Sequence, residues 1–201
     1  MAFFIIFLGL SAYYILIYYY SIKPRQKELE KSNKKLKLLY ELSVNFHESV
    51  ALENSLEKIL SEILGLVNAE VASLFLLDRK NGHFSCAVAV GPTADEVLKL
   101  KIPYGAGIVS KVEKEKAPIL CNDVETMPEH FKNIDEKLKF KTKSMICVPL
   151  FIKDDFMGAI QIINKKSGNS FENSDIEILS TISNIAALAI HNVNIIKNYS
   201  R

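Results

Sequence analysis

The stretch GAIQIINKKSGNSFENSD, at residues 158–175, combines an apolar strand, a turn and the start of a helix. Its mainly apolar run, residues 159–163, is bounded by polar residues and is typical of a β-strand. Ser174 is followed three residues later by a glutamate, which predicts a capping box and a helix from about residue 174. Lys165 and Asp175 flank the turn, so their side chains are placed to pair across it.

Two hairpins are predicted on the N-terminal side of this helix. AEVASLFLLD (69–78) and HFSCAVAVG (83–91) flank RKNG, whose Asn-Gly pair favours a tight hairpin turn. KSMICVPLFI (143–152) and FMGAIQIIN (156–164) flank a Lys-Asp-Asp turn. Residues 92–142 between them are mixed and contain PYGAGIVSKVEKEKAPIL, which predicts a short helix and then a short strand. The centre of the chain is therefore rich in strands.

A long helix is predicted on each side of this centre. The first covers residues 24 to about 66, and its last part, SLEKILSEILGL at 55–66, is amphipathic and must pack against another element. The second covers residues 174 to about 199, and its apolar face is broader than one sheet face is expected to cover. That face consists of Ile178, Ile182, Ile185, Ala189, Val193 and Ile196, with Leu179, Ala186 and Ile190 beside them. We therefore expect a parallel homodimer held by the first and last helices.

The N-terminal part of the first helix offers a candidate dimer seam. Leu29, Asn33, Leu36 and Tyr40 recur at spacings of four, three and four, which suits a two-stranded coiled coil with one polar core residue. A solvated spacer helix accounts for the same residues equally well, so both interpretations stay open.

The N-terminal segment AFFIIFLGLSAYYILIYYY, residues 2–20, contains no charged residue. As a helix it would be about 28 Å long, close to the roughly 30 Å thickness of the hydrocarbon core of a bilayer. Tyrosines crowd its C-terminal half, as they do at membrane interfaces. A cleaved signal peptide fits less well, because no Lys or Arg precedes the run and no A-x-A-like site follows it. We therefore predict one transmembrane helix within residues 1–22.

Basic residues dominate the segment after the predicted span. Seven basic and two acidic residues lie between positions 23 and 37, so the positive-inside rule places the rest of the chain in the cytoplasm, at the cell membrane. The basic residues are Lys23, Arg25, Lys27, Lys31, Lys34, Lys35 and Lys37. Because the whole chain has a formal charge of only +2, the remainder is mildly acidic, which argues against nucleic-acid binding. We interpret the basic run as a topology signal that contacts lipid headgroups.

No catalytic or metal site is expected from the sequence. Gly105-Ala106-Gly107 lacks the Gly-Lys-Ser/Thr that would complete a phosphate-binding loop. The four histidines show no metal-ligand spacing with one another or with the cysteines. The cysteines are interpreted as structural thiols, because a cytoplasmic domain is not expected to form disulfides. They are Cys86, Cys121 and Cys147.

The order of the hairpins, the Gly-containing middle and the closing helix resembles a GAF domain from about residue 40 to 198. The landmarks are SLFLLD (73–78), IPYGAGIVSKV (102–112), APILCNDV (117–124), FKTKSMICVPL (140–150) and GAIQIINK (158–165). The resemblance implies an α+β GAF fold with a six-stranded antiparallel sheet. It also implies that the first and last helices cover one sheet face and that a small-molecule pocket lies on the other. The expected parts are a transmembrane helix (1–22), a basic linker and coiled-coil helix (23–49) and a GAF domain (50–201).

GAF domains that bind cyclic nucleotides carry a motif of Asn-Lys, a variable turn, Phe, three residues and Asp-Glu. Asn164, Lys165, Phe171 and Asp175 match this motif, whereas Ile176 occupies the position of the Glu. In the family the Lys and Asp pair across the turn and brace the pocket wall without touching the ligand. The resemblance therefore implies an architectural pair, which would contribute about 0–1 kcal/mol if it is partly exposed.

The resemblance also implies a set of pocket residues. Phe131 would stack on a planar ligand, and the side chains of Ser73, Thr142 and Gln161 would supply hydrogen-bonding groups. The complete expected set is Ser73, Val88, Ala89, Ile108, Val109, Phe131, Thr142 and Gln161. The ligand would be a cyclic nucleotide or another small molecule. Ordinary sheet residues around a vestigial cavity are the alternative interpretation.

The function implied is that of a membrane-anchored sensory or regulatory module, which binds a small molecule and signals through a helical dimer to a separate output protein. Val88 and Ala89 replace an aromatic residue and an acid that would read a purine base, so the pocket is expected to be more apolar than a cyclic-nucleotide site. An enzyme is not expected, because Ile108-Val109-Ser110 lacks the lid thiols of the free methionine-sulfoxide reductases of this fold. The alternatives are a ligand-free dimerisation or scaffold module and the N-terminal fragment of a larger receptor.

Overall fold

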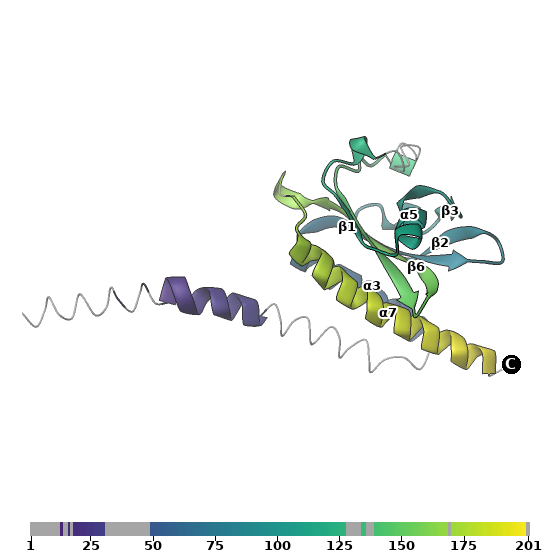
Figure 1. Ribbon diagram of the computed structural model, residues 1–201, viewed down its shortest axis with the longest axis horizontal. Helices are drawn as coiled ribbons and strands as arrows, with labels where there is room; N and C mark the ends of the chain where they lie inside the picture. The colour runs from purple at the N-terminus through teal and green to yellow at the C-terminus, as the bar shows by residue number, and fades with distance from the viewer. Residues whose placement is uncertain are drawn as a thin grey trace, which may run out of the picture. The chain divides into compact units, whose positions relative to one another are not determined.

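The computed structural model describes residues 13, 16, 18–30, 49–127, 134–135, 139–168 and 170–199 (Figure 1). The chain divides into two compact units, Met1–Tyr40 and Glu41–Arg201. In the first unit a π-helical turn, Tyr18–Ile22, leads into a helix over residues 23–30. Most of the predicted membrane span, and the seam positions from Asn33 to Tyr40, lie outside the described residues.

The second unit is built on a six-stranded antiparallel sheet, which confirms the predicted fold class. The strands are β1 (Ala69–Asp78), β2 (His83–Val90), β3 (Lys101–Pro103), β4 (Ile119–Cys121), β5 (Met145–Ile152) and β6 (Asp155–Lys165). Their order in the sheet is β3-β2-β1-β6-β5-β4. The two predicted hairpins are β1–β2 and β5–β6, and the pairing of β1 with β6 joins them at the centre.

Helices cover both faces of this sheet. The helices are α3 (Ser49–Val67), α4 (Ala94–Val97), α5 (Gly107–Glu115) and α7 (Asn173–Tyr199), with 3-10 turns η2 (Val124–Thr126) and η3 (Lys166–Gly168). The two long helices, α3 and α7, lie side by side on one face, and α5 lies on the other (Figure 1). Leu74, Ile160 and Val148 form a buried cross-strand row under the long helices. In the same layer the hydroxyl of buried Ser183 in α7 donates a hydrogen bond to the Pro149 carbonyl.

The broad apolar face of α7 is covered within a single chain. Ile178, Leu179, Ile182, Ala186, Ala189, Ile190 and Val193 are buried, Ile185 is half-buried, and the Ile196 side chain lies outside the described residues. Helix α7 contacts β5 on one side and α3 on another, so two elements share the face. The width of this face therefore does not by itself require a partner chain, and the homodimer stays a prediction. Its Asn173–Val193 part, with a mean hydropathy of 1.3, is the one described helix long and apolar enough to cross a membrane, yet half of it is buried.

Helix α7 starts with a different cap from the one predicted. The first helical residue is Asn173, so Glu172 occupies the N-cap position and Asp175 the third helical position. The Glu172 backbone N–H donates to Asp175 Oδ2 at 2.9 Å, which is one half of a capping box. The predicted capping box of Ser174 and Glu177 is therefore wrong, because Asp175 is held at the helix start by a pairing that only the tertiary structure provides.

Gly158 permits the close pairing of the two central strands. It lies opposite Leu76 in the β1–β6 ladder. A Cβ atom at this position would come within 1.9 Å of the Phe75 carbonyl oxygen. Any larger residue would therefore push β6 away from β1.

Candidate functional site

A single row of side chains crosses the sheet under α5. Strand register places Ala89 opposite Ser73, Ser73 opposite Gln161, Gln161 opposite Cys147, and Cys147 opposite Ile119. Directly opposed residues point to the same sheet face, so the row runs from β2 to β4. Ser73 is 1% exposed and Gln161 is 6% exposed. A hydroxyl and an amide therefore lie side by side at the centre of this face.

Helix α5 covers this row with an apolar face. Ile108, Val109 and Val112 are all buried and belong to the same core cluster as Ala89 and Cys147. Positive backbone φ angles at Gly105 and Gly107 turn the chain into the helix. The polar pair Ser73 and Gln161 is thus enclosed between a sheet and a helix that otherwise present apolar groups.

The cysteines of this cluster are uncharged at physiological pH. Burial raises the pKa of the Cys86 thiol to about 12. Burial also raises the pKa of the Cys147 thiol to about 12, although a hydrogen bond with the Gln161 side chain acts in the opposite direction. A buried thiol in apolar surroundings behaves as a small apolar side chain. Both are therefore core residues, as expected for Cys147, whereas Cys121 is half-buried.

The structure brings together some of the expected pocket residues and separates others. Ser73, Ala89 and Gln161 share the row under α5, and Ile108 and Val109 cover it. Phe131 lies outside the described residues.

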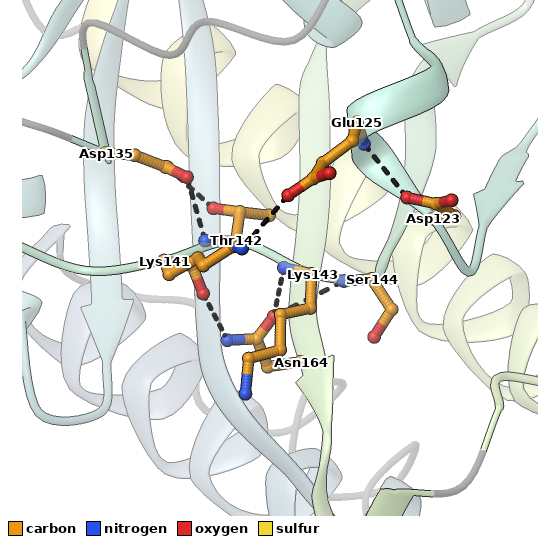
Figure 2. Close-up of polar contacts among 8 residues, drawn as sticks. All are labelled: Asp123, Glu125, Asp135, Lys141, Thr142, Lys143, Ser144 and Asn164. Atoms are coloured by element: carbon orange, nitrogen blue, oxygen red, sulfur yellow. Dashed lines mark hydrogen bonds and ion pairs between the residues drawn. The ribbon is translucent and has the colours of Figure 1, made fainter.

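Val88 lies on the opposite sheet face from the row under α5, and Thr142 bonds to Asp135. Val88 pairs with Leu74 and so belongs to the face covered by α3 and α7, because successive residues of a strand point to opposite faces. The Thr142 hydroxyl donates to Asp135 Oδ1 at 2.7 Å, and the Thr142 backbone N–H donates to Asp135 Oδ2 at 2.8 Å (Figure 2). The Thr142 hydroxyl therefore already has a hydrogen-bond partner seven residues earlier in the chain.

Asn164 is the centre of a hydrogen-bond network beside the site (Figure 2). Its Oδ1 accepts from the backbone N–H groups of Lys143 at 2.7 Å and Ser144 at 3.3 Å. Its Nδ2 donates to the Lys141 carbonyl at 2.9 Å and to Glu70 Oε2 at 2.8 Å. One amide thus fixes the segment that enters β5 against the end of β6 and the start of β1.

The Lys165–Asp175 pair of the motif is formed and mostly buried. Lys165 Nζ lies 2.7 Å from Asp175 Oδ2, and the two side chains are 14% and 7% exposed. Lys165 Nζ also lies 5.5 Å from the centre of the buried Phe171 ring. The same Asp175 oxygen accepts the cap bond from Glu172. The pair therefore joins the end of β6 to the first turn of α7.

Sequence reasoning missed Asn122, which binds the backbone of Phe171. The Phe171 N–H donates to Asn122 Oδ1 at 2.8 Å, and Asn122 Nδ2 donates to the Phe171 carbonyl at 3.2 Å. Nothing in the local sequence indicates this contact, because the two residues are 49 positions apart.

An open groove of about 760 Å³ lies on the outer side of α5. It is lined by Tyr104, Gly105, Gly107, Ser110, Lys111, Glu113, Lys114 and Glu115. The Tyr104 hydroxyl hydrogen-bonds to Glu113 Oε1 at 3.2 Å, and the negative charge of Glu113 raises the pKa of Tyr104. The groove faces solvent and carries charges of both signs, so it is distinct from the row under α5.

Comparison with known proteins places the domain in a family. The model of the family described as GAF domain matches residues 51–190. Dual 3',5'-cyclic-AMP and -GMP phosphodiesterase 11 of Drosophila melanogaster is 26% identical over an alignment of 197 residues, and the match covers 88% of this chain. The chain spans only 13% of the length of that protein.

Solved structures share the fold at lower identity. The GAF domain of a phosphoenolpyruvate-protein phosphotransferase from Coxiella burnetii aligns with a TM-score of 0.69 and 19% identity, over 82% of this chain and 96% of that chain. Free methionine-R-sulfoxide reductase from Neisseria meningitidis, in complex with its substrate, aligns with a TM-score of 0.64 and 19% identity, over 82% and 92%. Residues 122 to 287 of a methyl-accepting chemotaxis protein align with a TM-score of 0.65 and 19% identity, over 78% and 98%. The family match covers more than half of the sequence, and this chain therefore belongs to the GAF domain family.

Proposed function

We propose that this chain is a sensory module that binds a small molecule between α5 and the sheet. GAF domains are regulatory modules of signalling proteins, and the row under α5 supports a binding role for this one. The observation that carries the proposal is the pair of polar side chains, Ser73 and Gln161, buried within an apolar enclosure. The Gln161 side chain already bonds to the Cys147 thiol, and a bound molecule would supply the further hydrogen bonds that a buried hydroxyl and amide can make.

A ligand-free scaffold is the second candidate, favoured by the buried apolar side chains that α5 places over the row. The two candidates differ in the effect of the polar pair on the stability of the ligand-free domain. In a binding site the Ser73 hydroxyl would destabilise the empty domain, because a buried group kept for a ligand is left without that ligand's hydrogen bond. In a scaffold the pair would stabilise the domain through bonds within the protein.

Two buried serines distinguish these candidates. If the Ser73 hydroxyl serves a ligand, we expect Ser73→Ala to raise the free energy of unfolding of the ligand-free chain by about 1 kcal/mol, since a buried hydroxyl kept for a ligand costs free energy in the empty domain. The matched variant Ser183→Ala should lower it by about 1 kcal/mol, because the bond to the Pro149 carbonyl is lost. Urea titration after unfolding and refolding in ligand-free buffer measures both. Equal destabilisation by the two variants would favour the scaffold.

We propose no enzymatic activity. The solved relative from Neisseria meningitidis is a free methionine-R-sulfoxide reductase, so the fold itself is compatible with catalysis. Here Cys86 and Cys147 are buried, with thiol pKa values of about 12, which leaves Cys121 as the one half-buried thiol. A thiolate nucleophile would need a lowered pKa and access to substrate, and the two buried thiols have neither.

We also propose that the module is anchored in the cell membrane, faces the cytoplasm and pairs with a second copy through the linker helix. Among the described residues, Tyr18, Tyr19 and Tyr20 are exposed, and Lys23 Nζ lies 4.9 Å from the centre of the Tyr19 ring. Exposed aromatic and basic residues after an uncharged run suit a membrane interface. Leu29 in the same helix is 61% exposed and available to a partner. Two tethered copies would pass the signal to a separate output protein.

One variant tests both the topology and the pairing. Leu29→Cys, made together with Cys121→Ser, should react with a membrane-impermeant thiol reagent only after the cells are permeabilised. Mild oxidation should then link it into dimers. Glu53→Cys, on the exposed face of α3, is the control that should be labelled in the same way without being linked. Labelling in intact cells would contradict the cytoplasmic location, and absence of linked dimers would contradict pairing at Leu29.

A further inference from the structure

The row under α5 ends three residues before Asn122, which contacts the segment that leads into α7. Ile119, the last residue of the row, lies in β4, and Asn122 follows directly after this strand. The Asn122 amide makes two hydrogen bonds to the backbone of Phe171, at 2.8 and 3.2 Å. Phe171 is buried and lies two residues before the first helical residue of α7. The site and the start of the long helix are therefore joined by one side chain.

The first turn of α7 is bonded to the residues around Phe171, so it should move with the Phe171 backbone. Asp175 in the first turn receives the cap bond from Glu172 and the ion pair from Lys165. Lys165 Nζ in turn lies over the Phe171 ring. A displacement of the Phe171 backbone would therefore reach the first turn through the neighbouring Glu172 and through Lys165.

The residues that follow Asn122 are also bonded to the region that α5 covers. The Asp123 side chain accepts a hydrogen bond from the Glu125 N–H at 3.2 Å and caps η2. The Val124 N–H donates to the Lys143 carbonyl at 3.1 Å, and Val124 is fully buried in the core cluster that α5 covers. Changes in that cluster therefore alter the position from which Asn122 extends.

We propose that Asn122 is the positioning residue through which the state of the α5-covered site is passed to the first turn of α7. The proposal rests on the proposed regulatory function for its purpose, but the coupling itself requires no ligand. The contact is specific to the Asn122 amide, since one bond to the N–H and one to the carbonyl of the same residue fix both distance and orientation. Coupling between two sites is reciprocal. A change at the α5-covered site should therefore alter the first turn of α7, and the reverse, only while Asn122 is present.

Hydrogen exchange of the full chain in detergent, followed by mass spectrometry, tests the coupling. Asp123→Ala removes the η2 cap, and we expect exchange in the first turn of α7 to rise about fivefold, the change expected from one lost hydrogen bond. In a chain that already carries Asn122→Ala, adding Asp123→Ala should cause no further rise in exchange in that turn. Asp175→Asn should reciprocally raise exchange in η2, again only when Asn122 is intact.

A matched control removes another turn-capping aspartate. Asp78 accepts a hydrogen bond from the Asn81 N–H at 3.0 Å in the β1–β2 turn, far along the chain from α7. Asp78→Ala should change exchange in that turn and leave α7 unchanged. If Asn122→Ala does not fold, Asn122→Asp serves instead, because it keeps the acceptor for the Phe171 N–H and loses the donor. An equal effect of Asp123→Ala on α7 with and without Asn122, or no effect at all, would overturn the proposal.

Discussion

Asn164→Ala is expected to lower the free energy of unfolding by about 4 kcal/mol, counting about 1 kcal/mol for each of four side-chain hydrogen bonds. The side chain is 4% exposed, so water does not replace these bonds when they are lost. The Asn164 backbone also has a positive φ of 58°, a conformation that Asn adopts more readily than Ala. Urea denaturation followed by circular dichroism measures the loss.

Two further variants separate the causes of this effect. Asn164→Gly keeps the backbone conformation and loses only the hydrogen bonds, so it should be less damaging than Asn164→Ala by about 1 kcal/mol. Asn81→Ala removes an exposed turn asparagine that bonds to Asp78 at 2.7 Å, and it should cost less than about 1 kcal/mol. If Asn164→Ala proved as mild as Asn81→Ala, the network of Figure 2 would not stabilise the fold.

Lys165→Met is expected to cost about 3 kcal/mol or more, because it leaves the Asp175 carboxylate buried without its partner. This is larger than the 0–1 kcal/mol expected for a partly exposed pair, since the side chains are only 14% and 7% exposed. The sequence identified the two partners, but burial decides what breaking the pair costs. Unfolding by urea again provides the measurement.

A double-mutant cycle completes this prediction. The variant carrying Lys165→Met and Asp175→Leu leaves no buried charge, so it should lose less stability than the sum of the two single variants. Some loss should remain, because Asp175 also accepts the cap bond from Glu172. Additive losses would mean that the two side chains stabilise the domain independently of each other.

Local patterns in the sequence predicted the elements of the fold well. The Asn81-Gly82 turn and the flanking apolar runs located β1 and β2 to within one residue at each end. These signals are local: the backbone at Gly82 has a φ of 65°, and the Asn81 side chain bonds to Asp78 within the turn. The predicted start of α7 was also correct to within one residue, although its capping residues were not.

Sequence reasoning was incomplete where distant parts of the chain meet. Val88 and Ala89 are adjacent in sequence and face opposite sides of the sheet, and only the register with β1 shows which of them faces α5. The sequence showed that the apolar face of α7 is broad, but not that α3 covers part of this face. Asn122 and Asn164 make their bonds to residues of other elements, so no local pattern carries their roles.

The central claim is that the space between α5 and the sheet binds a small molecule, and ligand release tests it most directly. The full chain is purified in detergent and denatured, and the released compounds are identified by mass spectrometry. The same is done for a variant with Ser73→Ala and Gln161→Leu, and for Asn54→Ala on the exposed face of α3. We predict one compound in near-stoichiometric amount from the wild-type and Asn54→Ala chains and little from the double variant. The same compounds in equal amounts from all three chains, or none from any, would contradict the claim.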